Sequence, residues 1–206
     1  MILGPIAKTA LALLTTPIGT IERVCSFKLL GVHIESSLSW STHVNNMLKK
    51  TTRRLYFLKQ LKRAGLSSTQ LLYYYTAVIR PVLEYCVPVW HYALTKEQTQ
   101  QLEAIQKRAI HIIFNFTRGM PYTSMLYAAN ISTLVHRRED ISQKFFRDIT
   151  QPSSCLHHLL PAPREQSLIS RLRTYDKFRR VYTRIRRYCS FVNYALNNYQ
   201  EKITNP

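Results

Sequence analysis

The chain has 206 residues with a hydrophobic share of 46%, which suits one compact domain or two small ones and excludes wholesale disorder. Its 29 lysines and arginines, against 11 acidic residues, give a formal net charge of +18. Because such self-repulsion does not stabilise a fold, we expect the charge to serve a polyanion. Nucleic acid is the leading candidate. A membrane surface, an acidic protein and a merely solvated basic surface are the alternatives.

Cysteine usage and the first residues indicate an intracellular protein, nuclear or cytoplasmic. The four cysteines lie far apart without a CxxC pair, which predicts reduced thiols. A zinc site from Cys155, His157, His158 and Cys189 would lack paired ligands at either end. The apolar run Met1–Leu14 has no basic segment before it, so we expect neither a signal peptide nor a membrane span.

Residues 1–38 are predicted to form short strands. Pro17–Thr20 indicates a turn, and Ile21–Val24 and Phe27–Ile34 are rich in β-branched and aromatic residues. So few strands are only marginally stable alone, so we expect them to pack on the helix that follows.

A long helix is predicted from Ser39 or Ser41, as its cap, to Gly65 just past its end. Its apolar residues recur at steps of three and four, the spacing of one helix face. They are Val44, Met47, Leu48, Thr51, Leu55, Leu58 and Leu61. The basic residues between them are Lys49, Lys50, Arg53, Arg54, Lys59, Lys62 and Arg63.

Two capping boxes predict the next helices, one at Ser67 with Gln70 and one at Thr95 with Gln98. We expect Pro81 to end or kink the first of these helices, and the apolar segment Pro81–His91 to lie in the core. The second should bury apolar residues from Leu102 to Phe116.

Shorter elements are predicted for the remainder of the chain. After a break at Thr117–Tyr122, a short helix is expected at Ser124–Ala129, and Ser132 can cap a helix over Thr133–Thr150. Gln151–Pro163 is predicted to be a linker, because it has three prolines and no clear period. A basic tail with a helical stripe is predicted over residues 164–187. The last predicted element is a short amphipathic segment at Phe191–Tyr199.

The predicted fold is therefore mainly α, a helical thumb-like bundle with a small N-terminal antiparallel β element. We divide it into residues 1–38, 39–117 and 118–206, the last containing the linker and the tail.

No catalytic constellation is visible in the sequence. The three aspartates, Asp140, Asp148 and Asp176, form no adjacent pair of the kind that holds two metal ions. A nucleophile–base pair of Cys86 and His91 is conceivable, but the apolar run around them favours a packed thiol. We therefore predict no enzyme activity of its own, no metal and no cofactor.

Binding chemistry remains. From Ser36 to Leu83 the chain has no acidic residue, whereas lysines and arginines on a rigid helix can neutralise phosphates in register. Tyr73, Tyr74 and Trp40 are close enough in sequence to offer stacking, with burial in the core as the alternative.

A set of stretches in a fixed order forms a familiar pattern. They are SFKLLGVHIESSLSW, KKTTRRLYFLKQLK, IRPVLEYCVPVWH, LEAIQKRAIHII, the pair Arg137-Arg138 and SFVNYALNNYQ. The pattern resembles the downstream part of non-LTR (LINE, jockey-like) retrotransposon reverse transcriptases. The resemblance implies a fragment of an RNA-directed DNA polymerase from a transposable element, with the catalytic Asp-Asp motif and most of the palm absent.

This resemblance also implies roles for individual residues. Phe27, Leu30, Gly31 and Val32 would correspond to the primer grip, and Lys49, Lys50, Arg53 and Arg54 would lie on a thumb helix that faces a template–primer duplex. We add Lys59, Lys62 and Arg63 of the same helix as candidate phosphate contacts. The implied partners are RNA, DNA or an RNA–DNA hybrid, bound through phosphates without sequence preference, and an intact reverse transcriptase acting in trans. Tail residues that we add to the phosphate contacts are Lys177, Arg180, Arg184 and Arg187. A relic without function and an interaction protein are the alternatives.

A second resemblance rests on FK-LGV, KK and RLYFLK. This pattern is similar to the short N-terminal module of AlkB-type tRNA-modifying proteins. That module would imply a link to methyl transfer or to oxidation with iron and 2-oxoglutarate. None of the seven histidines begins the HxD part of an iron triad.

Overall fold

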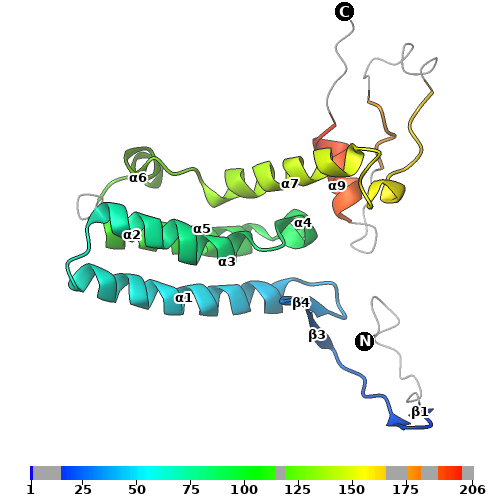
Figure 1. The fold of residues 1–206 in the computed structure, drawn as a ribbon, viewed down its shortest axis with the longest axis horizontal. Coiled ribbons are helices and arrows are strands. Elements are labelled where there is room, and N and C mark those ends of the chain that lie inside the picture. The colour runs from blue at the N-terminus through cyan, green and yellow to red at the C-terminus, as the bar shows by residue number, and fades with distance from the viewer. Residues whose placement is uncertain (2–14, 115–118, 166–175, 182–189, 201–206) are drawn as a thin grey trace, which may run out of the picture. The chain divides into compact units, whose positions relative to one another are not determined.

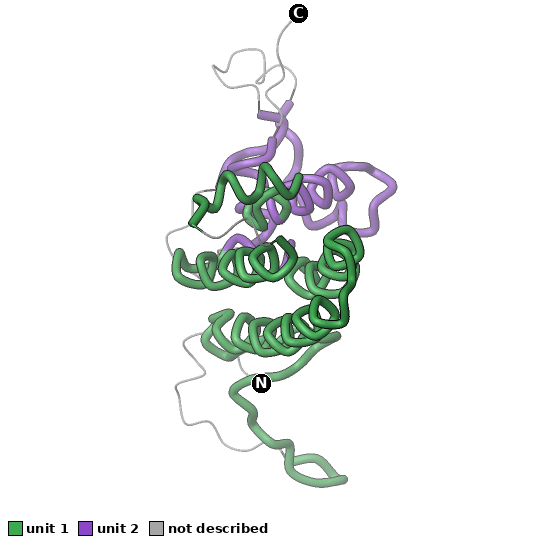
Figure 2. The backbone as a smooth tube through the Cα atoms, turned by 90° about the vertical axis from the view of Figure 1, so that its left-hand side faces the viewer, with its two compact units in different colours: residues 1–86, 93–137 green, residues 87–92, 138–206 purple. Residues whose placement is uncertain are grey.

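The structure, a computed structural model, describes residues 1, 15–114, 119–165, 176–181 and 190–200. It consists mainly of helices, with two small antiparallel hairpins near the N-terminus (Figure 1). The predicted fold class is confirmed. The chain divides into two compact units (Figure 2): unit 1 comprises residues 1–86 and 93–137, and unit 2 comprises residues 87–92 and 138–206. Each unit is described by itself, and the predicted domain boundaries stay predictions.

The first two strands form a minimal hairpin. β1 (Thr15–Thr16) pairs with β2 (Gly19–Thr20) across the predicted turn. Ile21–Val24 lies outside the strands that the structure describes, so the strand predicted there is wrong.

The second hairpin replaces the single strand predicted at Phe27–Ile34. β3 (Ser26–Leu29) pairs antiparallel with β4 (Val32–Glu35), and Phe27 faces Ile34 in the register. The two-residue turn consists of Leu30 and Gly31, with φ angles of 46° and 88°. Positive φ at both central positions matches the right-handed twist of a hairpin. The apolar residues on both sides concealed this turn in the sequence.

The long helix is confirmed as α1 (Ser41–Arg63), which buries Val44, Met47, Leu55 and Leu58. The N-cap is Trp40, whose side chain forms no capping bond, so the predicted cap at Ser39 or Ser41 is wrong. Instead, the Ser41 N–H donates to Ser39 Oγ, and the Thr42 N–H donates to Glu35 Oε1 of the hairpin at 2.6 Å. A carboxylate there satisfies a free N–H group and complements the helix dipole. Burial alone would raise the pKa of Glu35, but hydrogen bonds with Thr42, Ser37 and Ser39 lower it below its usual value.

The helix ends at Arg63, and Gly65, with a φ of 88°, lies just past the end as predicted. The N–H of Leu66 donates to the Leu61 carbonyl and that of Gly65 to Lys62, which satisfies carbonyls of the last turn.

The next helical segment passes through Pro81 instead of ending there. α2 (Ser68–Tyr74) begins at the predicted capping box, continues as the π-helical turn η2 (Tyr75–Ile79) and then as α3 (Arg80–Glu84). The N–H of Arg80 donates to the Tyr75 carbonyl, five residues back. Proline clashes with the carbonyl four residues before it in an α-helix, and the wider π-turn changes that geometry.

α5 (Lys96–Ile113) begins at the second predicted capping box, and α6 (Tyr122–Ala129) confirms the predicted short helix. In unit 1, α1 packs along α5 and against α2, η2 and α3 (Figure 1). Leu102, Ile105 and Ala109 are buried as predicted, Ile112 is half-buried, and Phe116 lies outside the described residues.

α7 (Leu134–Thr150) has its first residues in unit 1 and the others in unit 2. The N–H of His136 donates to Thr133 Oγ1 at 3.0 Å, so Thr133 caps this helix in place of the predicted Ser132. The difference is one residue of phase, which the sequence pattern does not resolve.

Unit 2 also contains α4 (Val87–Trp90), the 3-10 turn η5 (His157–Leu159) and α9 (Phe191–Asn198), which confirms the predicted end segment. The 3-10 turn η3 (His91–Ala93) follows α4. The core of unit 2 is formed by Phe146, Phe178, Ala195 and Leu196.

The helical stripe predicted in the basic tail is wrong where the structure describes it. Residues 176–181 form no helix, and Tyr182, Ile185 and Tyr188 of that stripe lie outside the described residues. Across the described part of the chain, no helix combines the length and the hydropathy that a membrane crossing requires.

Candidate functional site

A groove in unit 1 has a volume of about 780 Å³ and lies between the β3–β4 hairpin, α1 and α3. Basic side chains come from both the hairpin and the helix, and none of the described residues that line the groove carries a carboxylate. The lining residues are Lys28, Gly31, His33, His43, Asn46, Met47, Lys49, Lys50, Arg53, Arg54, Pro81, Val82 and Tyr85.

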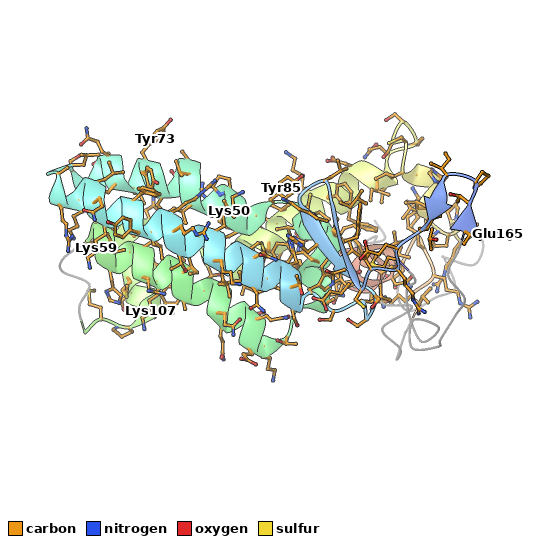
Figure 3. All side chains as sticks on the ribbon, turned by 90° about the horizontal axis from the view of Figure 1, so that it is seen from below. Lys50, Lys59, Tyr73, Tyr85, Lys107 and Glu165 are labelled. Carbon is orange, nitrogen blue, oxygen red and sulfur yellow. The ribbon has the colours of Figure 1, made fainter. Side chains whose placement is uncertain are left out.

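The cations of the α1 wall are residues that the sequence predicted, whereas His43 and Asn46 of the same wall were not predicted. Lys49, Lys50 and Arg53 are exposed and lie within about one turn of each other, so their charges face the same space. Figure 3 shows Lys50 on the solvent side of α1. Three cations so placed, with no acid among the described residues around them, favour an anionic ligand.

Arg54 has a structural partner inside the same groove. Its guanidinium donates from Nη1 to the carbonyl of Val78 in the π-turn. Arg54 therefore joins α1 to η2 next to Pro81, where the helical hydrogen bonding is irregular.

The opposite wall centres on Tyr85, which sequence analysis did not select. Its hydroxyl donates to the Leu30 carbonyl in the hairpin turn at 2.7 Å. The ring lies against Gly31, where an added Cβ would come 3.3 Å from Tyr85 Cε1. Gly31 thus supplies both the positive φ and the space that this contact needs.

The four predicted primer-grip residues have different surroundings. Gly31 lines the groove, Val32 at the start of β4 is buried, and Phe27 and Leu30 are exposed on the hairpin.

His43 holds the hairpin on α1. Its side chain is 3% exposed, and its Nδ1 accepts a hydrogen bond from the backbone N–H of His33 at 3.4 Å. Burial, with a smaller effect from His33, lowers the pKa of His43 to about 4. The ring is therefore neutral at pH 7 and adds shape to the groove but no charge.

The remaining predicted cations of α1 lie outside this groove. Lys59 and Arg63 are exposed, whereas Lys62 Nζ donates to the carbonyl of Ile112 in the last turn of α5. A cation at a helix C-terminus is stabilising, so Lys62 connects two helices of unit 1.

The predicted tail residues belong to unit 2. Lys177 is exposed, with Nζ 5.6 Å from the centre of the Phe178 ring. Arg180 forms a bidentate ion pair with the buried Asp176, at 2.6 and 3.2 Å. Arg184 and Arg187 lie outside the described residues.

The Arg137-Arg138 pair quoted for the first resemblance is largely structural. Arg137 forms an ion pair with Glu84, with 3.1 Å between Nη2 and Oε2. Arg80 Nε lies 3.7 Å from the same carboxylate, and Arg138 is fully buried. The only acid of the segment Pro81–His91 is thus held by two arginines.

A second polar cluster, in unit 2, surrounds Glu139. The carboxylate contacts His91 Nε2 at 3.0 Å and accepts hydrogen bonds from the hydroxyls of Tyr194, at 2.9 Å, and Tyr199. Burial raises the pKa of both tyrosines, and Glu139 raises it further. The phenols therefore remain donors and attach α9 to α7.

The aspartates and cysteines that the structure describes form no further cluster. Asp140 and Asp148 are exposed on α7, as expected for a solvated face. Among the described residues, no three or more His, Cys, Asp or Glu side chains come together in a way that could hold a metal ion. Cys189 lies outside those residues.

The family model that matches the chain is that of alkylated DNA repair protein AlkB homolog 8, N-terminal, over residues 40–80. The matched stretch contains α1, α2 and η2, and thus the basic wall of the groove. No curated protein and no solved structure matches the chain.

This match overturns the expected origin in a non-LTR retrotransposon reverse transcriptase, and the classification as a transposable-element polymerase is wrong with it. The stretches that suggested a reverse transcriptase consist of apolar residues at helical spacing with lysines and arginines between them, next to a glycine-containing turn. Any basic helical hairpin of this construction can present them. The second resemblance, to the module of AlkB-type proteins, agrees with the match.

Proposed function

We propose that the protein is a nucleic-acid-binding module that takes the sugar-phosphate backbone in the groove between α1 and the β3–β4 hairpin. The observation that supports this most is the row of Lys49, Lys50 and Arg53, with no acid among the lining residues in the described part of the chain. Contacts of this type release counterions from the nucleic acid and carry no sequence information.

The similarity of residues 40–80 to the AlkB homolog 8 N-terminal model supports a second element of the proposal. The module works beside an enzyme that modifies nucleic acid, of the methyltransferase or the iron and 2-oxoglutarate class, and contributes binding, not catalysis. An oligonucleotide with methylated bases, incubated with the chain, iron(II) and 2-oxoglutarate, should come back unchanged. Loss of the methyl groups would overturn this division of labour.

The groove is tested by removing its charges without removing its structural arginine. Lys49→Ala, Lys50→Ala and Arg53→Ala are combined, whereas Arg54 is kept because it supports the π-turn. Alanine is a strong helix former, so α1 should persist. The control combines Lys96→Ala, Lys107→Ala and Arg108→Ala, which removes the same charge from exposed positions of α5.

The measurement is the binding constant for a fluorescent oligonucleotide as a function of salt. Each lost phosphate contact makes the negative slope of log K against log salt shallower by about 0.7 to 0.9. When the salt concentration rises from about 50 to 200 mM, the binding constant of the wild type should therefore fall by a factor roughly 20 to 40 times larger than that of the groove variant. Equal slopes for the groove variant and the control would show that net charge, not the groove, determines binding.

A further inference from the structure

The ring of Tyr85 is held in place at the groove although the residue is 49% exposed. The hydrogen bond to the Leu30 carbonyl fixes its outer end, and the ring packs against Gly31. An aromatic side chain of this size gains stability from burial, and here much of its surface remains in water. A ring that is already fixed loses little entropy when a flat ligand stacks on it.

Further exposed aromatic residues lie on the same side of unit 1. Phe57 follows Lys50 by seven residues, or two helical turns, so both lie on one stripe of α1. Phe57 is 56% exposed, and Tyr73 on α2 is 74% exposed. In Figure 3, Tyr73, Lys50 and Tyr85 follow one another along the unit.

Cations flanked by exposed rings form the pattern that binds single-stranded nucleic acid. The cations follow the backbone, and the rings take the faces of unpaired bases. A duplex gains nothing from such rings, because its bases already stack on each other. A volume of about 780 Å³ is in the range of sites for small ligands, which suits a short stretch of strand.

We propose that the groove prefers single-stranded RNA or DNA to duplex, with one base stacked on Tyr85 and the neighbouring phosphates on Lys49, Lys50 and Arg53. This inference rests on the proposed function and adds the class of nucleic acid. Phe57 and Tyr73 continue the same track for the next bases.

The experiment compares an oligothymidylate of about 12 nucleotides with a duplex of equal length, at one salt concentration and on the full chain. Tyr85→Leu removes the ring, and Tyr85→Phe keeps the ring but removes the bond to Leu30. The control is Tyr127→Leu, which changes a tyrosine that is 90% exposed on α6 of the same unit. An oligonucleotide with 2-aminopurine reports stacking through its fluorescence.

The wild type should bind the single strand more tightly than the duplex and change the 2-aminopurine fluorescence. Tyr85→Leu should weaken single-strand binding about 5- to 150-fold, the range expected for one lost base stack, and leave the duplex unaffected. Tyr85→Phe should keep most of the affinity, and Tyr127→Leu all of it.

Equal, salt-dependent binding of both oligonucleotides that does not change in Tyr85→Leu would overturn the single-strand preference and leave the proposed function intact. A Tyr85→Phe variant as weak as Tyr85→Leu would assign the effect to the hairpin contact and overturn stacking. Absence of binding to either oligonucleotide would overturn both proposals and leave an acidic protein as the partner of this surface.

Discussion

Gln106 is a fully buried side chain of α5 that connects several elements of unit 1. Its Oε1 accepts a hydrogen bond from the Tyr75 hydroxyl at 2.5 Å. Its Nε2 donates to the Tyr122 hydroxyl at 3.0 Å and to the Ser132 carbonyl at 2.9 Å. Burial raises the pKa of Tyr75 well above its usual value, so this phenol is a hydrogen-bond donor at neutral pH.

Replacing Gln106 by leucine keeps the volume but removes these hydrogen bonds. The Tyr75 hydroxyl and the Ser132 carbonyl lose the bonds that Gln106 provides, whereas Tyr122 keeps its bond to Glu103 at 2.6 Å. Ser132 is exposed, so water can replace the bond to its carbonyl, whereas the Tyr75 hydroxyl stays buried. An unsatisfied buried group destabilises by about 1 to 3 kcal/mol, so Gln106→Leu should lower the free energy of unfolding by about 1 to 3 kcal/mol. Stabilities of small domains are about 5 to 15 kcal/mol, so the loss is large.

A double-mutant cycle isolates the bond to Tyr75. Tyr75→Phe alone should cost about 1 to 3 kcal/mol, because it leaves Gln106 Oε1 unsatisfied. The double variant removes both partners and should cost less than the sum of the single variants by a similar amount. Urea unfolding followed by circular dichroism measures each step, with the exposed Gln100→Leu on α5 as the control. A Gln106→Leu variant as stable as this control, or strictly additive losses, would refute the reasoning.

Two further predictions concern stability. Since the pKa of His43 is about 4 in the fold and about 6.5 in the unfolded chain, the unfolded chain binds the proton first as the pH falls, and stability should decrease by up to about 3 kcal/mol between pH 6.5 and 4. Urea unfolding across this window should give a smaller decrease for His43→Gln; an equal decrease would point to other groups, such as His91, whose pKa burial also lowers. Thr133→Ala should destabilise by about 1 kcal/mol through loss of the α7 cap, and Ser132→Ala should have little effect in the same measurement, since it keeps the carbonyl that Gln106 contacts. The reverse order would return the cap to Ser132.

Local chemistry explains which elements could be predicted from the sequence. Ser67 with Gln70 and Thr95 with Gln98 form hydrogen bonds within four residues, so their letters alone place α2 and α5. The apolar face of α1 likewise follows from the spacing of apolar residues within that helix alone. The hairpin turn at Leu30-Gly31 was missed because apolar residues surround it, and the π-turn because Pro81 suggests an end, not a wider turn.

In the candidate site, the sequence predicts the residues that follow from local helix geometry and misses those that meet only in the folded chain. Lys49, Lys50 and Arg53 follow from the helix period, but Lys28 and Tyr85 meet them only through tertiary structure. The bonds of Arg54 to Val78 and of Lys62 to Ile112 join residues that are 24 and 50 positions apart. No spacing rule separates such structural cations from those that face solvent.

The π-turn between α2 and α3 determines the direction in which the residues after it face. A π-turn carries one residue more than the α-turn it replaces, so shortening η2 by a single residue would restore regular pitch. If the same residues instead formed a regular α-helix, every residue after the turn would lie about 100° further around the helix axis. Tyr85 would then point away from Gly31 although its own neighbours in sequence are unchanged, so the wide turn compensates for one extra residue and keeps this wall of the groove in place.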